Sequence, residues 1–475
     1  MADPVLTGTC RSGTGDGPVL RGNGPMGVPT GTKRRRCDRT LPRYGQPTVT
    51  TMITDRLEAK VGGQAQKRGL IPRTPAPERL LADAAIWLTG EYADAVRSTR
   101  QRTLLNGAVE LAIDLHPAAP PLIITASDAG RVAVTGETAV AGPGYHRFVG
   151  RVLERLATDI GIEWTDGDGA LTFTDRHTAE QAYLAWLGPQ LARARVAVRR
   201  GERAVHLGMP PGTRVTTEAA LATVLGPRDE AWLDAAIADP HVALDITPWW
   251  TDATDGHYLR NRALVLLWLE VRWRAPAVEG EADLLDEVHR LLSRAFPMDP
   301  ALTYPWHAWA QLTAFRGIND QMARQAAGRA AREAEPEVPV GYRRDPVRIT
   351  HEGWSLEIPG SYAERRSADE WWAGGAGRAI TLAATRTGLA DGAAMPAQAF
   401  IEQFGADLGR DALTHRDGEM IGRARLTTDA TSGVEIGVLE GYSAIRGSGS
   451  AVRIEFDDPA DWQWALDTWR ELRPG

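Results

Sequence analysis

The run Val109-Glu110-Leu111-Ala112-Ile113-Asp114-Leu115 alternates apolar and polar side chains, a pattern typical of a half-buried β-strand. Two further strand-like runs follow, Leu122 to Thr125 and Arg131 to Thr135. Between them, Asp128-Ala129-Gly130 suits a tight turn. We therefore predict a three-stranded antiparallel meander over residues 109–135.

Helical patterns flank this meander. Apolar residues recur at three-to-four-residue spacing over residues 81–96 and again over 145–160, which predicts two amphipathic helices. Thr178-Ala179-Glu180-Gln181 fits a capping box, so another helix should start there, and Gly188-Pro189 should end or kink it. From residue 216 to about 330 helical patterns dominate. There, the run His257–Trp273 has so little polar face that we expect it to be buried on most sides.

Beyond a polar stretch broken by two prolines, the hydrophobic period changes from helical spacing to two. This change predicts a separate domain of antiparallel strands, with helices over residues 396–404 and 459–472 packed against them. The whole chain is therefore expected to be an α+β protein. The predicted parts are a disordered basic tail (1–74), an α+β domain with the meander (75–212), a mainly helical region packed on it (213–333), a linker (334–345) and a C-terminal α+β sandwich (346–475).

The predicted C-terminal sandwich resembles a known family. Its opening Trp354-Ser355-Leu356-Glu357-Ile358-Pro359, its long strands and its closing Asp461–Trp469 helix look like the Mog1/PsbP-like α+β sandwich. The resemblance rests on pattern and covers about 130 residues, under a third of the chain. It implies a binding or accessory role, and it carries over no functional residue.

The first 74 residues differ in composition from the rest. Residues 1–50 contain nine Gly and six Pro, which is typical of disorder. Residues 1–75 hold 13 Lys and Arg against 5 Asp and Glu, a net +8; since the whole chain carries −7, the remainder carries −15. An acidic body is poorly suited to nucleic acid, so only the basic tail with Lys33-Arg34-Arg35-Arg36 offers such a contact. A natural start at Met52 is an open alternative for this segment.

Composition also limits the chemistry. Both cysteines, Cys10 and Cys37, lie in the tail, so the body has neither a disulfide framework nor thiol catalysis, which suits a reducing cytoplasm. No apolar run is long enough to cross a membrane. The sequence contains no Gly-x-Ser-x-Gly elbow and no His-Glu-x-x-His motif. We therefore expect no cofactor and assign no catalytic residue.

Two clusters could bind a partner or ligand. Gly142-Pro143-Gly144-Tyr145-His146 opens a helix where free amides could hold an anion, although a simple turn with Tyr145 in the core explains the same residues. Trp306 and His307 could line an aromatic pocket, or could instead start a helix that is packed into the core.

The third cluster runs from Trp249 and Trp250 to His257. Asp252, Asp255 and His257 offer oxygen and nitrogen ligands for a divalent metal within six residues. In the alternative, Asp255 caps the following helix and both tryptophans pack beneath a solvated turn. No standard metal-site spacing matches.

From these patterns we predict a non-catalytic cytoplasmic binding or adaptor protein whose partner is another protein. Its binding residues would be Tyr145, His146, Trp249, Trp250, Trp306 and His307. The alternative is a metal-dependent hydrolase that uses the acids and histidine at 252–257. Acids and imidazoles from far-apart segments meeting in one deep, dry cleft would argue for an enzyme.

Overall fold

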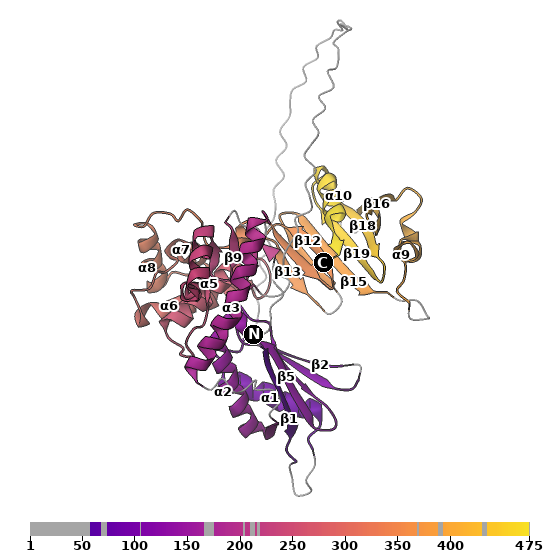
Figure 1. The fold of residues 1–475 in the computed structure, drawn as a ribbon. Helices are drawn as coiled ribbons and strands as arrows, with labels where there is room; N and C mark the ends of the chain where they lie inside the picture. Colours follow the sequence, from indigo (N-terminus) through magenta and orange to yellow (C-terminus); the bar gives the residue numbers. More distant parts are fainter. Residues whose placement is uncertain are drawn as a thin grey trace, which may run out of the picture. The chain divides into compact units, whose positions relative to one another are not determined.

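The computed structural model describes residues 58–67, 74–104, 106–165, 175–202, 205–209, 214–215, 219–367, 370–387, 393–429 and 435–474. The basic cluster at 33–36 and Met52 lie outside these residues. So does Asp166-Gly167-Asp168-Gly169, whose composition predicts a hairpin. Pro47–Gly475 forms one compact unit. Its antiparallel sheets and helices confirm the predicted α+β class (Figure 1).

A six-stranded antiparallel sheet organises residues 58–165. The predicted meander is present as three neighbouring strands, with one strand added at one side and two at the other. Along residues 109–114, buried Val109, Leu111 and Ile113 alternate with partly exposed residues, as the sequence predicts. The strands, in the order β2-β3-β4-β5-β1-β6, are β2 (Ser98–Thr103), β3 (Val109–Asp114), β4 (Leu122–Ala126), β5 (Arg131–Glu137), β1 (Glu58–Ala65) and β6 (Ile162–Thr165).

Strand β1 shows that order begins earlier than the predicted tail boundary at residue 74. It pairs with β5 over seven positions and with β6 over four. Ala59, Val61 and Ala65 are buried in the same core as the meander. The tail prediction for 58–65 is therefore wrong, because backbone pairing to two distant strands organises a segment whose own side chains favour no element.

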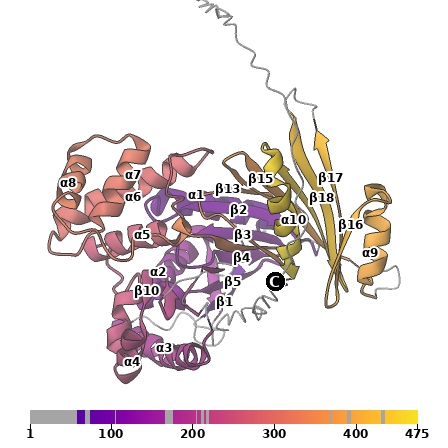
Figure 2. The same ribbon diagram turned by 90° about the horizontal axis from the view of Figure 1, so that it is seen from above.

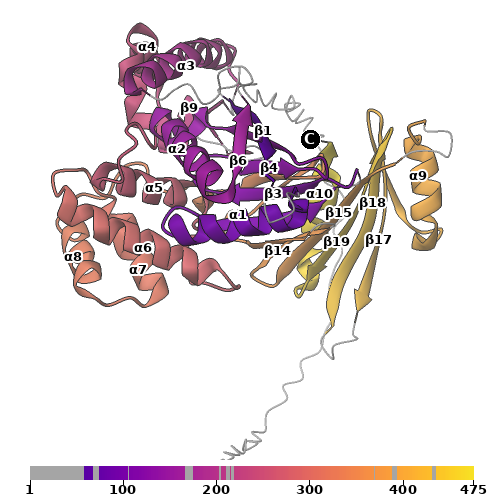
Figure 3. The same cartoon turned by 90° about the horizontal axis from the view of Figure 1, so that it is seen from below.

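Two helices cover one face of this sheet, α1 (Pro77–Glu91) and α2 (Pro143–Ile160) (Figure 3). Both were predicted from their apolar spacing. The next helix, α3 (Arg176–Arg199), begins earlier than predicted, because Asp175 rather than Thr178 is the cap and accepts a hydrogen bond from the Thr178 amide at 2.8 Å. It also continues through Pro189, with Trp186, Leu187 and Leu191 buried on either side of that proline.

Residues 219–330 are mainly helical, as predicted for this region, and their first residues form a small sheet with residues 206–207. Helix α5 is buried on most sides, as the run His257–Trp273 indicates. The helices are α4 (Glu230–Ala238), α5 (Gly256–Leu269), α6 (Glu281–Met298), α7 (Trp306–Arg316) and α8 (Gln321–Ala330), with the 3-10 helix η2 (Pro240–Ile246). The small sheet contains β7 (His206–Leu207), β9 (Leu221–Thr223) and β10 (Gly226–Arg228).

The C-terminal part contains two antiparallel sheets. The first has the order β20-β12-β11-β8, so that β8, from the predicted helical region, pairs with β11 across the predicted linker. Its strands are β20 (Arg473–Pro474), β12 (Trp354–Ile358), β11 (Val347–His351) and β8 (Arg214–Val215). The second, in order, comprises β13 (Ala363–Arg366), β14 (Glu370–Gly375), β15 (Arg378–Arg386), β19 (Ser448–Phe456), β18 (Ile436–Ile445), β17 (Met420–Asp429) and β16 (Leu413–Asp417).

Helices α9 (Ala397–Phe404) and α10 (Trp462–Glu471) pack on opposite faces of the seven-stranded sheet (Figure 2). A Cβ at Gly449 would meet Phe400 of α9, and a Cβ at Gly441 would meet Trp469 of α10. Gly449 pairs with Ala444, three positions from Gly441, so the two glycines face opposite sides. The spacing of Trp462, Ala465 and Trp469 predicts that all three face inward from α10. Ala465 and Trp469 are buried, whereas Trp462 is 46% exposed.

The end of the predicted linker 334–345 is anchored. Tyr342 is buried and packs against Trp268 at 4.8 Å between ring centroids. Its hydroxyl donates to the Thr223 carbonyl at 2.9 Å. The linker prediction is therefore wrong for Tyr342, which belongs to the 3-10 helix η3 (Tyr342–Arg344) and fastens strand β9. No helix within the described residues is long and apolar enough to cross a membrane.

Candidate functional site

The loop at Gly142 and the tryptophans at 249–250 come together, although they are a hundred residues apart. The Gly144 amide donates to the Trp249 carbonyl at 3.0 Å, and the Trp249 amide donates to the Ala141 carbonyl at 2.9 Å. Tyr145 is fully buried, with its ring 6.0 Å from that of Trp249, and Trp250 packs edge-on against Tyr183. Because the Gly144 amide is already bonded and Pro143 has none, this helix start has little left to offer an anion.

A substitution pair within α2 tests this close packing. A Cβ at Gly144 would overlap the Thr251 carbonyl oxygen and lie 2.8 Å from the Trp249 carbonyl oxygen, whereas a Cβ at Gly150 meets nothing within 4 Å. Gly144→Ala should therefore destabilise the fold by about 3 kcal/mol. Gly150→Ala should stabilise it by about 0.5–1 kcal/mol, because glycine weakens a helix interior. Urea unfolding measures both, and equal effects would contradict the close approach.

His146 is buried and accepts or donates a 2.7 Å hydrogen bond at Nδ1 with the Thr138 hydroxyl. Burial lowers the pKa of His146 to about 4. Since the unfolded chain takes up this proton first, at about pH 6.5, stability should fall as the pH drops from about 6.5 to 4. The loss from this residue reaches about 3 kcal/mol. Urea unfolding at about pH 7.5 and 4.5 should show a smaller pH effect in His146→Gln than in the wild type, and exposed His177→Gln is the control. An unchanged pH effect in His146→Gln would contradict this assignment.

The three proposed metal ligands each have another partner, and Nδ1 of His257 lies 3.3 Å from the side-chain amide of Asn261. Asp252 forms ion pairs with Arg147, at 2.9 Å, and with Arg151. Asp255 caps α5 and accepts from the Tyr258 amide at 2.9 Å, as the alternative interpretation held. Among the described residues, no group of three His, Cys, Asp or Glu side chains could hold a metal ion. The geometry therefore gives the metal hypothesis no support.

Trp306 lies in a packed aromatic cluster. It is buried and stacks on Trp309, with ring centroids 5.5 Å apart and planes 11° apart. The Nε2 atom of His307 is buried and has no hydrogen-bond partner among the described residues. These rings fill space between α6 and α7, in agreement with the core interpretation.

Ser293, His289 and Asp320 have the composition of a catalytic triad but not its geometry. In a triad, the serine and the acid contact different ring nitrogens. Here, Asp320 at 2.8 Å and Ser293 at 3.5 Å both meet Nε2 of His289, while Nδ1 accepts from the Trp309 indole at 3.0 Å. The serine is therefore not activated by this histidine.

The main site is a cavity of about 860 Å³, which we call the charged cavity. Its central wall comes from the segment after α1, the paired ends of β2 and β3, helices α5 and α6, and the segment between these two helices. Its C-terminal wall comes from η3, β11 and β13. The charged residues of the central wall are Asp94, Arg97, Asp114, Arg262, Glu270, Arg272, Glu279, Glu281, Asp283, Glu287 and Arg290; those of the C-terminal wall are Arg343, Arg348, Glu364 and Arg366.

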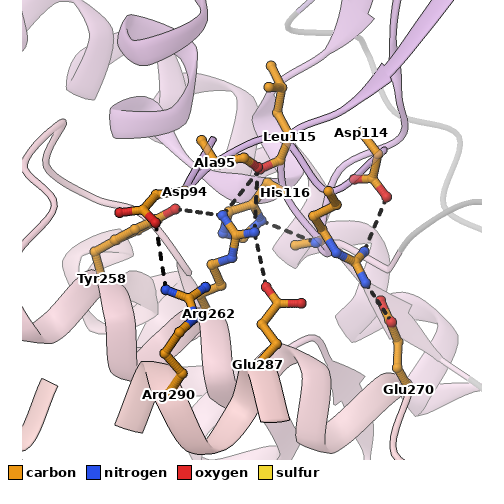
Figure 4. Close-up of polar contacts among 12 residues, drawn as sticks. Asp94, Ala95, Asp114, Leu115, His116, Tyr258, Arg262, Glu270, Glu287 and Arg290 are labelled. Atoms are coloured by element: carbon orange, nitrogen blue, oxygen red, sulfur yellow. Dashed lines mark hydrogen bonds and ion pairs between the residues drawn. The ribbon is translucent and has the colours of Figure 1, made fainter. Parts of the chain in front are cut away.

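Arg262 forms the floor of the central wall (Figure 4). Only 2% of its side chain is exposed, and it donates to Glu287 at 3.1 Å and to the Tyr258 hydroxyl at 3.0 Å. Tyr258 lies four residues earlier on α5, so both side chains share one helix face. A buried guanidinium is tolerated because it is paired and hydrogen-bonded.

Arg97 holds two acids from distant parts of the chain. It donates to Asp114 at 3.2 Å and to Glu270 at 2.7 Å. Burial raises the pKa of Asp114, and Arg97 only partly opposes that effect. One carboxylate oxygen of Asp114, Oδ1, is buried without a hydrogen-bond partner among the described residues. Acids from β3, α5 and α6 thus meet at one cavity.

His116 lies behind this floor and is fully buried (Figure 4). Its pKa lies well below the ordinary value because of burial and then because of Arg262 and Arg97. The neutral ring accepts from the Ala118 amide through Nδ1 at 3.2 Å, so Nε2 carries the proton. That Nε2 has no partner among the described residues.

The residues of the charged cavity were missed from the sequence. They come from seven segments between residues 93 and 366 with no shared spacing. One feature of the sequence could have indicated this site. Arg262 lies inside a helical run that is otherwise predicted to be buried, and a buried arginine requires a partner.

Comparison with known proteins adds little to this site. No protein-family model matches the chain, and no curated protein matches it significantly. A crystal structure of a protein from Bacteroides thetaiotaomicron VPI-5482 is similar, with 9% identity and a TM-score of 0.23. The match covers 26% of this chain and 45% of that one, so it spans less than half of that protein. At this TM-score the similarity supports no conclusion about fold or function.

Proposed function

We propose that the chain is a non-catalytic binding protein and that the charged cavity is its binding site. The observation that carries the proposal is the cavity itself, which has a volume of about 860 Å³ and is lined by many charged side chains. This volume lies within the range of about 300–1,000 Å³ that is usual for sites of small molecules. The ion pairs at Arg97 and Arg262 hold its charged groups in place before a ligand arrives.

The lining favours binding over catalysis. Its described residues include no histidine, cysteine or tyrosine, so no nucleophile–imidazole pair faces the cavity. Asp114, Glu270 and Glu287 each form an ion pair with an arginine, which fixes the position of each carboxylate. Such groups bind and orient a ligand better than they transfer protons.

The proposed binding site differs from the binding residues that were predicted from the sequence. Tyr145, His146, Trp249 and Trp306 are buried, so a partner cannot reach their side chains in the folded state. A protein partner, a cytoplasmic location and the Mog1/PsbP-like character of residues 346–475 stay predictions. The cysteine-free body supports the location.

A thermal-shift screen tests the proposal. Charged metabolites at millimolar concentration should include compounds that raise the melting temperature, because a ligand that binds only the folded state stabilises it. The shift should disappear in Arg348→Glu and in Asp283→Arg, which alter opposite walls. Arg416→Glu, on the distant strand β16, is the control. Ligands that bind both cavity variants as tightly as they bind the wild type would contradict the proposal.

A second candidate, a hydrolase, is favoured by the convergence of Asp114, Glu270 and Glu287 from three segments. The raised pKa of Asp114, due to burial, would suit a proton donor. Compounds found in the screen should be incubated with the protein and analysed by mass spectrometry. Conversion that is lost in Asp114→Asn would establish the hydrolase, whereas recovery of unchanged ligand supports binding alone.

Metal removal tests the other hydrolase hypothesis, which uses Asp252, Asp255 and His257. Because Asp252 is engaged by Arg147 and Arg151, we expect chelation to change the melting temperature by less than about 1 °C. Elemental analysis should find no stoichiometric divalent metal in the purified protein. One equivalent of metal that is lost in Asp252→Asn would contradict this prediction.

A further inference from the structure

The charged groups without an ion-pair partner differ in sign between the two walls of the charged cavity. On the central wall every lining arginine is paired with an acid, and the lining acids without a partner among the described residues are Glu279 and Asp283. On the C-terminal wall the only acid, Glu364, is taken by Arg272 and Arg343. Arg366 there forms no hydrogen bond or ion pair with the described residues, whereas Arg348 forms no hydrogen bond but lies near the acids Glu357 and Glu471. Acids without a partner on one wall and arginines without a hydrogen bond on the other therefore line the same cavity.

Mutual attraction of the walls does not account for these groups. The attachment across the cavity is made by Arg272 with Glu364 at 3.1 Å, reinforced by Arg343 with Glu364 at 2.7 Å. If Arg348 and Arg366 served the same purpose, they would contact Glu279 or Asp283. No such ion pair joins these described side chains, and about 860 Å³ of space lies within the cavity that they line.

Buried atoms on the central wall also lack partners. Oδ1 of Asp114 and Nε of Arg262 have no hydrogen-bond partner among the described residues. A buried polar atom without a partner costs free energy, so each favours a ligand or an ordered water that supplies one. The carboxylate oxygen requires a donor, and an ammonium or guanidinium group is the strongest donor for it.

We propose that the charged cavity binds a zwitterionic amino carboxylate. Its ammonium or guanidinium group would lie against Asp114, Glu279 and Asp283 on the central wall. Its carboxylate would lie against Arg348 and Arg366 on the C-terminal wall, where arginine can bind both oxygens. This inference rests on the proposed binding function and names the ligand class of the same site.

Length-matched probes test the class directly by calorimetry. Aminohexanoate, diaminohexane and adipate share a six-carbon chain and differ only in their charged ends, and the corresponding sets with four and eight carbons vary the span. At its best length the amino carboxylate should bind at least about tenfold more tightly than its matched diamine or diacid, since each of these places one like charge against a wall.

A charge-reversal variant tests whether the C-terminal wall binds the carboxylate of the ligand. Arg366→Glu should reverse the preference, so that the diamine binds better than the amino carboxylate. The neighbouring Arg365→Glu is the matched control, because Arg365 lies over the Trp372 ring and does not line the cavity. Melting temperatures of both variants show whether each is folded.

The outcomes separate the inference from the proposed function. A diamine or diacid that binds as tightly as the amino carboxylate, with affinity lost in Arg366→Glu or Asp283→Arg, overturns the inference and leaves the binding function intact. Failure of every amino carboxylate in the length series to bind also overturns it, while the metabolite screen still decides the function. Binding that is indifferent to both variants overturns the two together.

Discussion

Glu364→Ala is expected to destabilise the protein by about 3–5 kcal/mol, since it breaks a buried ion pair from one side. The Glu364 side chain is 9% exposed and accepts hydrogen bonds from Arg272, Arg343 and the Trp371 indole. Without it, two neighbouring guanidinium groups are left unpaired and repel each other. Burial, followed by Arg343, already lowers the pKa of Arg272 to about 10, which shows how unfavourable this charge is even with its acid present.

Urea unfolding followed by tryptophan fluorescence measures the effect. Glu364→Gln, which keeps the volume and one acceptor, should lose most of the same stability, because the charge is the main contribution. Glu370→Ala is the control, since Glu370 is exposed at the start of the neighbouring strand β14. A loss below about 1 kcal/mol for Glu364→Ala would show that these arginines find other partners or water.

The elements that could be predicted from the sequence are those in which the spacing of apolar residues indicates which side chains are buried. The alternation at 109–115 identified β3, apolar spacing identified α1 and α2, and the apolar run His257–Trp273 identified α5. Strand β1 was missed because Glu58–Ala65 contains one β-branched residue and two adjacent glycines, so its conformation depends on pairing with β5 and β6. Local propensity cannot reveal a strand that is specified by its partners.

The candidate site was less predictable than the fold, for a related reason. Clusters that are close in sequence, such as Asp252 and Asp255, attract attention, but here their side chains cap a helix or bind arginines. The charged cavity is assembled by tertiary packing, which brings Arg97 within 2.7 Å of Glu270, although the two are 173 residues apart. A chain in which many arginines are paired with acids gives no local sign of which arginines lack such a partner.

Arg262→Met is the second substitution with a large expected effect. Methionine fits an apolar environment, but the change leaves the Glu287 carboxylate without its buried partner and removes a donor from the Tyr258 hydroxyl. The side chain that is lost is 2% exposed, so water cannot replace it without opening the contact between α5 and α6. We expect a loss of about 3–5 kcal/mol in the free energy of unfolding.

The double variant Arg262→Met with Glu287→Leu separates the charge from the packing. Removing both partners of a buried ion pair costs much less than removing one, so the double variant should recover at least about half of the loss. Arg290→Met is the control on the same cavity, because its pair with Asp94 is exposed and 3.8 Å long and should contribute at most about 1 kcal/mol. If Arg262→Met costs no more than Arg290→Met, the Arg262 charge is not confined as its contacts indicate, and the floor of the charged cavity is open to water.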